Sequence, residues 1–251
     1  MLGYRPLRYA AGALLVVIIG GALYWFTQNP AVGGATAYAP EFKPDNFVAK
    51  ITNTYFALPP GRKFSYVKKV ANGTERTEIV VLNETKTVMG VTTVVVWARE
   101  WLNDKLKEDT KDWYAQDKDG NVWYFGEAVA NYKNGKLDNS AGSWEAGVDG
   151  ARPGIIMPAN PKVGLTYQQE YAKGKAEDMG TIIAVGKRVK VPHGDFHDCV
   201  QTRDWSRIER TANEYKYYCP QVGFVVLEES AWLGASLFGA SKSELVGIAS
   251  E

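Results

Sequence analysis

Short extended segments separated by glycine-containing turns fill most of this chain, and they restrict it to an antiparallel β fold. The segments Arg62–Val70 and Thr74–Leu82 flank Asn72-Gly73, a dipeptide typical of a two-residue hairpin turn. Asn134-Gly135 repeats this signature further along the chain. Helical and strand patterns do not alternate. The sequence therefore predicts a mainly β protein of roughly nine to eleven strands in meander order, curved into a half-barrel or packed as a sandwich.

An apolar run from Ala10 to Phe26 indicates a membrane anchor ahead of the β-rich region. Arg5 and Arg8 precede the run, and no basic residue follows it before Lys43, so the N-terminus is predicted to be cytoplasmic. The run is longer than the apolar part of an ordinary signal peptide. We therefore expect one N-terminal transmembrane helix, with the remainder of the chain periplasmic or extracellular.

A cleaved secretory signal is the alternative, because Ala35-Thr36-Ala37 has the small-x-small pattern that signal peptidase prefers. With a retained anchor, residues 1–27 form the cytoplasmic tip and transmembrane helix, and residues 28–46 form a tether rich in proline, glycine and alanine. Residues 47–251 then form the extracytoplasmic β-domain. At its start, the four-residue spacing of Phe47, Ile51 and Tyr55 predicts a short amphipathic helix.

The charge balance argues against nucleic acid as a partner. The formal net charge is +1, and the basic residues form no tract. Aromatic residues make up 12% of the chain, which suits packing across strands or stacking on flat ligands.

Two cysteines, Cys199 and Cys219, are expected to form a disulfide in an oxidising compartment. The segments Asp195–Arg207 and Thr211–Glu228 are predicted to be two strands joined by a short polar turn. If the cysteines lie opposite each other, Gln201 faces Tyr217. Two buried free thiols are the alternative.

A glycine-rich segment, residues 140–164, is predicted to be a long loop beside a ligand pocket or partner contact. Strand alternation places Trp123, Phe125 and Glu127 on one face of the preceding hairpin. The predicted ligand- or partner-binding residues are these three together with Trp144, Glu145 and Asp149. Alternatively, the loop only plugs the open end of the barrel, with Trp144 as its core anchor and Glu145 capping backbone amides.

Asp117, Asp119 and Asn121 resemble part of a calcium loop, because clustered oxygens beside a glycine turn suit a hard cation. The spacing does not fit a complete EF-hand, so a simple hairpin turn is the more economical interpretation. Calcium is the one metal that the sequence suggests, and no other cofactor is expected.

Chemistry on a glycosidic bond would need two suitably spaced carboxylates. The acidic residues around the glycine-rich segment are Asp112, Asp117, Asp119, Glu127, Glu145, Asp149, Glu170, Glu177 and Asp178, and their spacing selects no pair. Trp113, Trp123 and Trp144 are candidates for a sugar platform. The sequence lacks a nucleophile elbow, a phosphate loop and a dinucleotide fingerprint, so enzyme activity is the least favoured interpretation.

Three segments, Asp112–Glu127, Gly142–Ala151 and Tyr217–Gly223, resemble a family of uncharacterised exported bacterial β-rich proteins. The resemblance covers about Arg62 to Glu228 and implies no catalytic residue. The last of these segments and the apolar strand that follows it are similar to the final strands of periplasmic half-barrels of the lipoprotein-carrier type. That similarity implies a concave sheet that holds apolar ligands.

The sequence as a whole favours a non-enzymatic, membrane-anchored extracytoplasmic domain. It would act as a binding module or as an accessory subunit of a membrane protein complex, with the membrane and other subunits as partners. The alternative is an exported protein that binds calcium, a carbohydrate or an apolar ligand. A carbohydrate-active enzyme comes third.

Overall fold

The computed structural model describes residues 38–209, 213–230 and 241–250. The predicted transmembrane helix, the alternative cleavage site and most of the tether lie outside these residues and stay predictions. Within the described part of the chain, no helix has the length and apolar character needed to cross a membrane.

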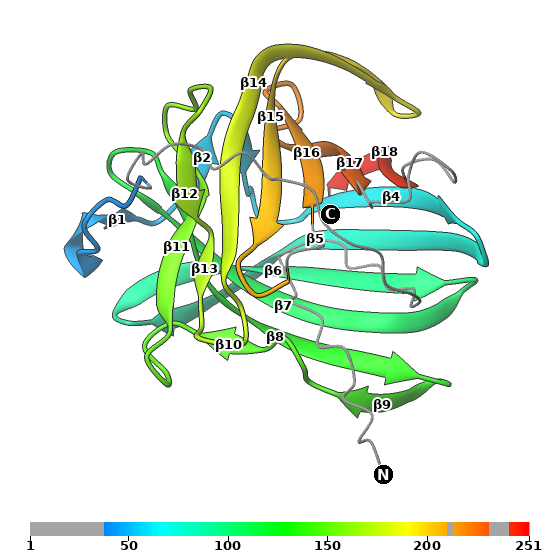
Figure 1. The fold of residues 1–251 in the computed structure, drawn as a ribbon, viewed down its shortest axis with the longest axis horizontal. Helices are drawn as coiled ribbons and strands as arrows, with labels where there is room; N and C mark the ends of the chain where they lie inside the picture. Colours follow the sequence, from blue (N-terminus) through cyan, green and yellow to red (C-terminus); the bar gives the residue numbers. More distant parts are fainter. Residues whose placement is uncertain (1–37, 210–212, 231–240, 251) are drawn as a thin grey trace, which may run out of the picture.

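An antiparallel sheet dominates the described residues and curls into a nearly closed barrel (Figure 1). The first half is a meander of β4 (Arg62–Val70), β5 (Gly73–Val88), β6 (Val91–Leu102), β7 (Lys105–Asp117), β8 (Val122–Lys133) and β9 (Lys136–Asn139). The second half comprises β11 (Arg152–Met157), β14 (Asp178–Val191), β15 (Gly194–Ser206), β16 (Asn213–Cys219), β17 (Phe224–Ser230) and β18 (Ser241–Ser250). Short elements complete the set: η1 (Pro44–Asn46), β1 (Phe47–Val48), β2 (Thr52–Asn53), β3 (Phe56–Ala57), β10 (Trp144–Glu145), β12 (Thr166–Gln168) and β13 (Glu170–Tyr171).

Two connections close the barrel. The last strand, β18, pairs with β4, which joins the end of the chain to the start of the meander. On the other side, β12 pairs with β14 while β13 pairs with β11, so one extended segment, Thr166–Tyr171, bridges the two halves. In Figure 1 the strands β4–β9 run roughly horizontally, and β11–β16 cross them almost upright. The predicted mainly β, antiparallel fold is confirmed.

The barrel interior has an aromatic end and a charged end. Phe64 stacks on Phe224 with ring centroids 4.7 Å apart, and Tyr114 stacks on Tyr124 at 4.9 Å. Further along β4 the inward residue is Lys68, which lies opposite Glu75 on β5. Every second residue of a strand points into the barrel. These inward residues are apolar toward one end of the barrel and ionisable toward the other.

The predicted disulfide between Cys199 and Cys219 is confirmed. It links β15 to β16, and both sulfurs are buried. The predicted register is confirmed as well, since Gln201 pairs with Tyr217. The second predicted strand of this pair was too long, because a turn over residues 220–223 divides it into β16 and β17.

Two further predictions about local structure are wrong. The helix expected at Phe47, Ile51 and Tyr55 is replaced by η1 and the short strands β1–β3, because Phe47 pairs with Asp117 of β7 and its ring packs on Trp123. Residues 140–164 are not a continuous loop. They contain β10 and β11, which extend the sheet beyond β8.

Candidate functional site

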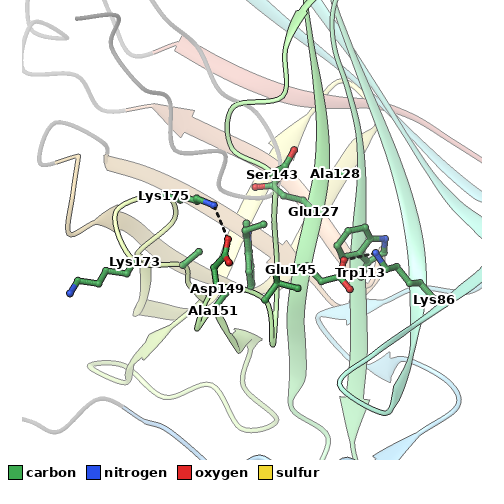
Figure 2. A pocket seen from close by; sticks show the side chains of 13 residues that line it. Lys86, Trp113, Glu127, Ala128, Ser143, Glu145, Asp149, Ala151, Lys173 and Lys175 are labelled. Atoms are coloured by element: carbon green, nitrogen blue, oxygen red, sulfur yellow. Dashed lines mark hydrogen bonds and ion pairs between the residues drawn. The ribbon is translucent and has the colours of Figure 1, made fainter.

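A hollow of about 420 Å³ lies where β8 and β10 meet the turns at residues 145–151 and 172–175 (Figure 2). Four of the six residues predicted to bind a ligand or partner line it: Glu127, Trp144, Glu145 and Asp149. We refer to this feature as the hollow.

At one end of the hollow, Lys86 is held by an acid and an aromatic ring. Its Nζ atom lies 2.7 Å from Glu145 Oε2 and 3.5 Å from the ring centroid of Trp113. Lys86 comes from the far end of β5, Trp113 from β7 and Glu145 from β10. Both charged side chains are about one-third exposed, so an ion pair is available to a binding partner.

The other end of the hollow carries a second ion pair and the exposed side chain of Val148, with the exposed Met89 nearby. Asp149 Oδ2 lies 3.6 Å from Lys175 Nζ. Val148, beside it, is 52% exposed, and Met89, in the turn between β5 and β6, is 40% exposed. The two turns touch, because a Cβ atom on Gly147 would lie 2.9 Å from Met89 Cγ.

Trp144 separates the hollow from the barrel interior. It is only 5% exposed, and its ring meets that of Tyr124 at 90°, with centroids 5.3 Å apart. This part of the loop-plug interpretation matches the structure, since Trp144 is a core anchor. Glu145, by contrast, forms the ion pair with Lys86 described above.

β10 can dock on β8 because of Gly126. A Cβ atom there would lie 2.4 Å from the carbonyl oxygen of Trp144. The φ angle of Gly126 is +133°, in the region that favours glycine. The docked strand places Trp144 opposite Glu127 and Glu145 opposite Gly126.

The prediction that Trp123, Phe125 and Glu127 share one face is wrong. A β-bulge interrupts the pairing of β7 with β8, so that Trp113 pairs with Gly126 but Tyr114 pairs with Tyr124. The extra residue reverses the alternation beyond Phe125. Glu127 therefore faces into the barrel, opposite Asp112.

Trp123 and Phe125 instead belong to an aromatic cluster under the start of the described chain. Their rings pack against Phe42 and Phe47, with centroids 5.5–6.1 Å apart. Neither residue lines the hollow. The predicted site is thus divided between the hollow, this cluster and the interior.

Two of the three predicted calcium-loop residues, Asp117 and Asn121, have their side-chain oxygens engaged within the protein. Asp117 accepts hydrogen bonds from the Asn121 backbone and side-chain amides and from the Trp123 indole, each at 2.8 Å. Asn121 Oδ1 accepts from the Ala159 amide at 2.9 Å. Among the residues that the structure describes, no group of three or more histidine, cysteine, aspartate or glutamate side chains is arranged to hold a metal ion. Calcium binding at Asp117, Asp119 and Asn121 stays a prediction.

Four of the acidic residues around the glycine-rich segment meet inside the barrel, although they lie far apart in sequence. They are Asp112 on β7, Glu127 on β8, Glu170 on β13 and Asp178 on β14. Burial raises the pKa of Asp112 to about 7 and raises the pKa of Glu127 and Glu170 as well. Sequence spacing could not reveal this group, because strand pairing and the bulge bring its members together.

Lys86, Val148 and Lys175 line the hollow, and Met89 lies beside it near Gly147, but the sequence indicated none of these four residues. No local sequence pattern marks them, because turns that are distant in the sequence bring them together.

Comparison with known proteins leaves the family undetermined. No family model matches the sequence, and no curated protein matches it. A crystal structure of a "putative lipoprotein" from Parabacteroides distasonis ATCC 8503 is similar over 78% of this chain and 98% of its own, with 13% identity and a TM-score of 0.42. This likeness is too distant to carry an argument. The resemblance to exported bacterial β-rich proteins stays a prediction.

Proposed function

We propose that this protein is a non-enzymatic binding module, held outside the membrane by its N-terminal segment, and that the hollow binds a protein partner. The observation that carries the proposal is the composition of the hollow. The hollow has an accessible ion pair at each end and includes the exposed apolar side chain of Val148, and the exposed Met89 lies close to the adjoining turn at Gly147. A polypeptide can bury an apolar side chain there and replace one partner of each ion pair with its own charge.

The geometry favours a protein partner over a sugar. Trp113 is 7% exposed and lies beneath the Lys86 ammonium group, and Trp144 is 5% exposed. Neither ring offers an open face on which a pyranose could stack. An apolar ligand inside the barrel has no comparable support, because the aromatic end is filled by Phe64, Tyr66 and their neighbours.

A catalytic role for the acidic residues is likewise unsupported, because a substrate could not reach their carboxyl groups. Asp112, Glu127 and Glu170 are 1%, 2% and 0% exposed, respectively. A glycosidic bond needs both carboxyl groups in contact with substrate. Carboxyl groups this deeply buried can interact with one another and with neighbouring side chains, but not with a bound substrate.

Affinity purification from native membranes tests the proposal. The full chain carries a C-terminal tag, and proteins recovered with it are compared between wild type, Val148→Asp and the double variant Lys86→Met/Glu145→Gln. We expect both variants to lose the wild-type partner at least tenfold. Val148 is half exposed, and exposed ion pairs contribute only about 0–1 kcal/mol, so the melting temperature should change little.

A matched control is the double variant Lys111→Met/Glu84→Gln. This pair also involves a lysine and a glutamate, 3.0 Å apart and exposed, but lies outside the hollow. Retention of the partner by the control and its loss from the hollow variants supports the proposal. Equal recovery with all four proteins would show that the hollow is not the binding site.

A further inference from the structure

The four carboxyl groups inside the barrel, Asp112, Glu127, Glu170 and Asp178, form what we call the acidic layer. Asp112 and Glu127 lie directly opposite each other on β7 and β8. Glu170 and Asp178 lie close enough that each acts on the pKa of the other. If both are ionised they repel each other and neither has a proton to donate, whereas one bound proton lets the two share a hydrogen bond.

Half of the eight carboxyl oxygens of the layer meet no donor among the described residues unless a proton is bound. Both carboxyl oxygens of Glu170, one of Asp178 and one of Glu127 are buried without a hydrogen-bond partner. Asp112 accepts from the Tyr124 hydroxyl at 2.7 Å. The Tyr114 hydroxyl, also buried, has no hydrogen-bond partner. A buried carboxylate left in this condition is costly, whereas a protonated one is both neutral and a donor.

The cations of the interior already have acidic partners. Lys216 Nζ lies 3.2 Å from Asp204, 3.3 Å from Glu214 and 3.9 Å from Glu228. Lys68 Nζ lies 4.0 Å from Glu75.

Other acids add to the negative charge facing the layer. Glu108 on β7 acts on Asp112 and Glu127, and Asp204 on β15 acts on Asp178. Glu100 on β6 lies opposite Glu108. The positive charge that reaches Asp178 comes from Lys216.

The layer lies directly beneath the hollow. β10 contains only two residues, and Trp144 within it pairs with Glu127. The indole nitrogen of Trp144 is buried without a hydrogen-bond partner, and Trp144 acts on the pKa of Glu170. Besides the ladder pairing of β10 with β8, two hydrogen bonds hold this segment in place: from the Ala146 amide to the Phe125 carbonyl and from the Val129 amide to the Ser143 hydroxyl, both 2.9 Å. A strand this short has few hydrogen bonds to lose when it opens locally.

We propose that the acidic layer is a proton-binding site that controls the docking of β10 and thereby makes the shape of the hollow depend on external pH. With protons bound, the carboxyl groups donate to one another and Trp144 stays seated. When the protons leave, negative charges in a water-poor interior repel one another, and β10 releases so that water can reach them. The regulatory consequence rests on the proposed binding role of the hollow, but the proton-dependent opening does not.

Burial of the carboxyl groups determines whether the stability of the fold rises or falls with pH. Desolvation raises the pKa of every member of the layer, that of Asp112 to about 7, and it raises the pKa of Glu100 to about 8. Each group's stabilisation is therefore complete below its unfolded pKa of about 4 and is lost as pH rises through the folded value. The stability of the fold should fall between about pH 5 and 8.

Hydrogen exchange and thermal unfolding of the purified full chain test this inference. After correction for intrinsic exchange rates, we expect protection of the Ala146 and Val129 amides to fall between pH 5.5 and 8. The unfolding equilibrium constant should rise by a factor of up to about ten per pH unit for each additional proton that the folded state holds.

Neutral variants supply the second measurement. Asp112→Asn and Glu170→Gln each remove one titrating group, so each should weaken the pH dependence of protection and melting temperature. Glu84→Gln, an exposed acid on β5, should leave both profiles unchanged. Flat or rising stability between pH 5.5 and 8 in the wild type would overturn the proposal. The proposal would also be overturned if global stability fell with rising pH while the hydrogen-exchange protection of the Ala146 and Val129 amides stayed constant. Failure of the hollow as a binding site would instead appear in the co-purification experiment alone.

Discussion

At the scale of single residues, the barrel interior contains charged side chains at positions that are usually apolar. Lys216 is nearly inaccessible, yet three carboxylates surround its ammonium group. Their proximity raises its pKa well above the ordinary value, so the group stays charged at any physiological pH. The lysine thus offsets part of the negative charge that strand pairing gathers at this end of the barrel.

Lys216→Met should destabilise the fold by about 3–5 kcal/mol at pH 7, because the buried Asp204 and Glu228 and the partly buried Glu214 would lose their shared cation. Chemical denaturation measures the change. Lys242→Met is the control, because it removes a cation from an exposed pair with Glu229, 2.7 Å away, and should cost no more than about 1 kcal/mol. Similar losses for the two variants would show that the interior charges are not coupled.

Gly126→Ala should lower stability by about 1–3 kcal/mol, because alanine at φ +133° is strained and its methyl group would collide with the Trp144 carbonyl. The variant should also expose β10, which limited proteolysis can detect. Gly135→Ala is matched to it: this glycine also has a positive φ, +75°, but nothing lies within 4 Å of the added methyl group. Proteolysis of residues 140–151 at the same rate in both variants would contradict the role assigned to Gly126.

At the scale of elements, strands were predictable where the sequence of a single hairpin contains its turn signature or fixes its register. Asn72-Gly73 marked the β4–β5 turn, and the positions of Cys199 and Cys219 gave the β15–β16 register. The β8 bulge was not predictable, because Phe125 and Gly126 look like ordinary members of an alternating strand. Long-range pairing also overrode local spacing at Phe47, where contact with β7 replaced the expected helix. Lys86 and Lys175 were missed for the same reason, since turns that are distant in the sequence form the hollow.

Replacing both cysteines by alanine should cost about 3 kcal/mol, because the disulfide closes a segment with a sequence separation of 20 residues. Denaturant unfolding of the variant and of wild type measures the loss. If the variant proves as stable as the oxidised wild type, the bridge does not contribute to the stability of the β15–β16 pair.

At the scale of the whole molecule, the sheet forms a nearly closed barrel with two different ends: aromatic side chains pack at one end, and buried ionisable side chains gather at the other. The curved antiparallel architecture was evident from turn spacing. Its near closure was not, because closure depends on Thr166–Tyr171 pairing on both sides, and no local pattern encodes two partners for one segment.

The N-terminal anchor remains the largest untested prediction. Intact-mass measurement of the native protein should include the segment Ala10–Phe26, and the protein should stay with membranes through alkaline extraction. A mature chain that begins near Tyr38 would establish the cleaved signal instead.

The pairing of β18 with β4 has a consequence for how the chain reaches its native state. Ser243 lies opposite Lys68, and Ser250 lies opposite Arg62, so the contacts that join the two ends of the meander span most of the sequence. Such non-local contacts slow folding, since a long loop must close before any of them contributes. Until residue 250 leaves the ribosome, β4 and β17 each lack a neighbour, and such edges recruit other chains. The last ten residues of the barrel therefore protect the nascent protein from aggregation, and their deletion should yield insoluble material despite an intact hollow.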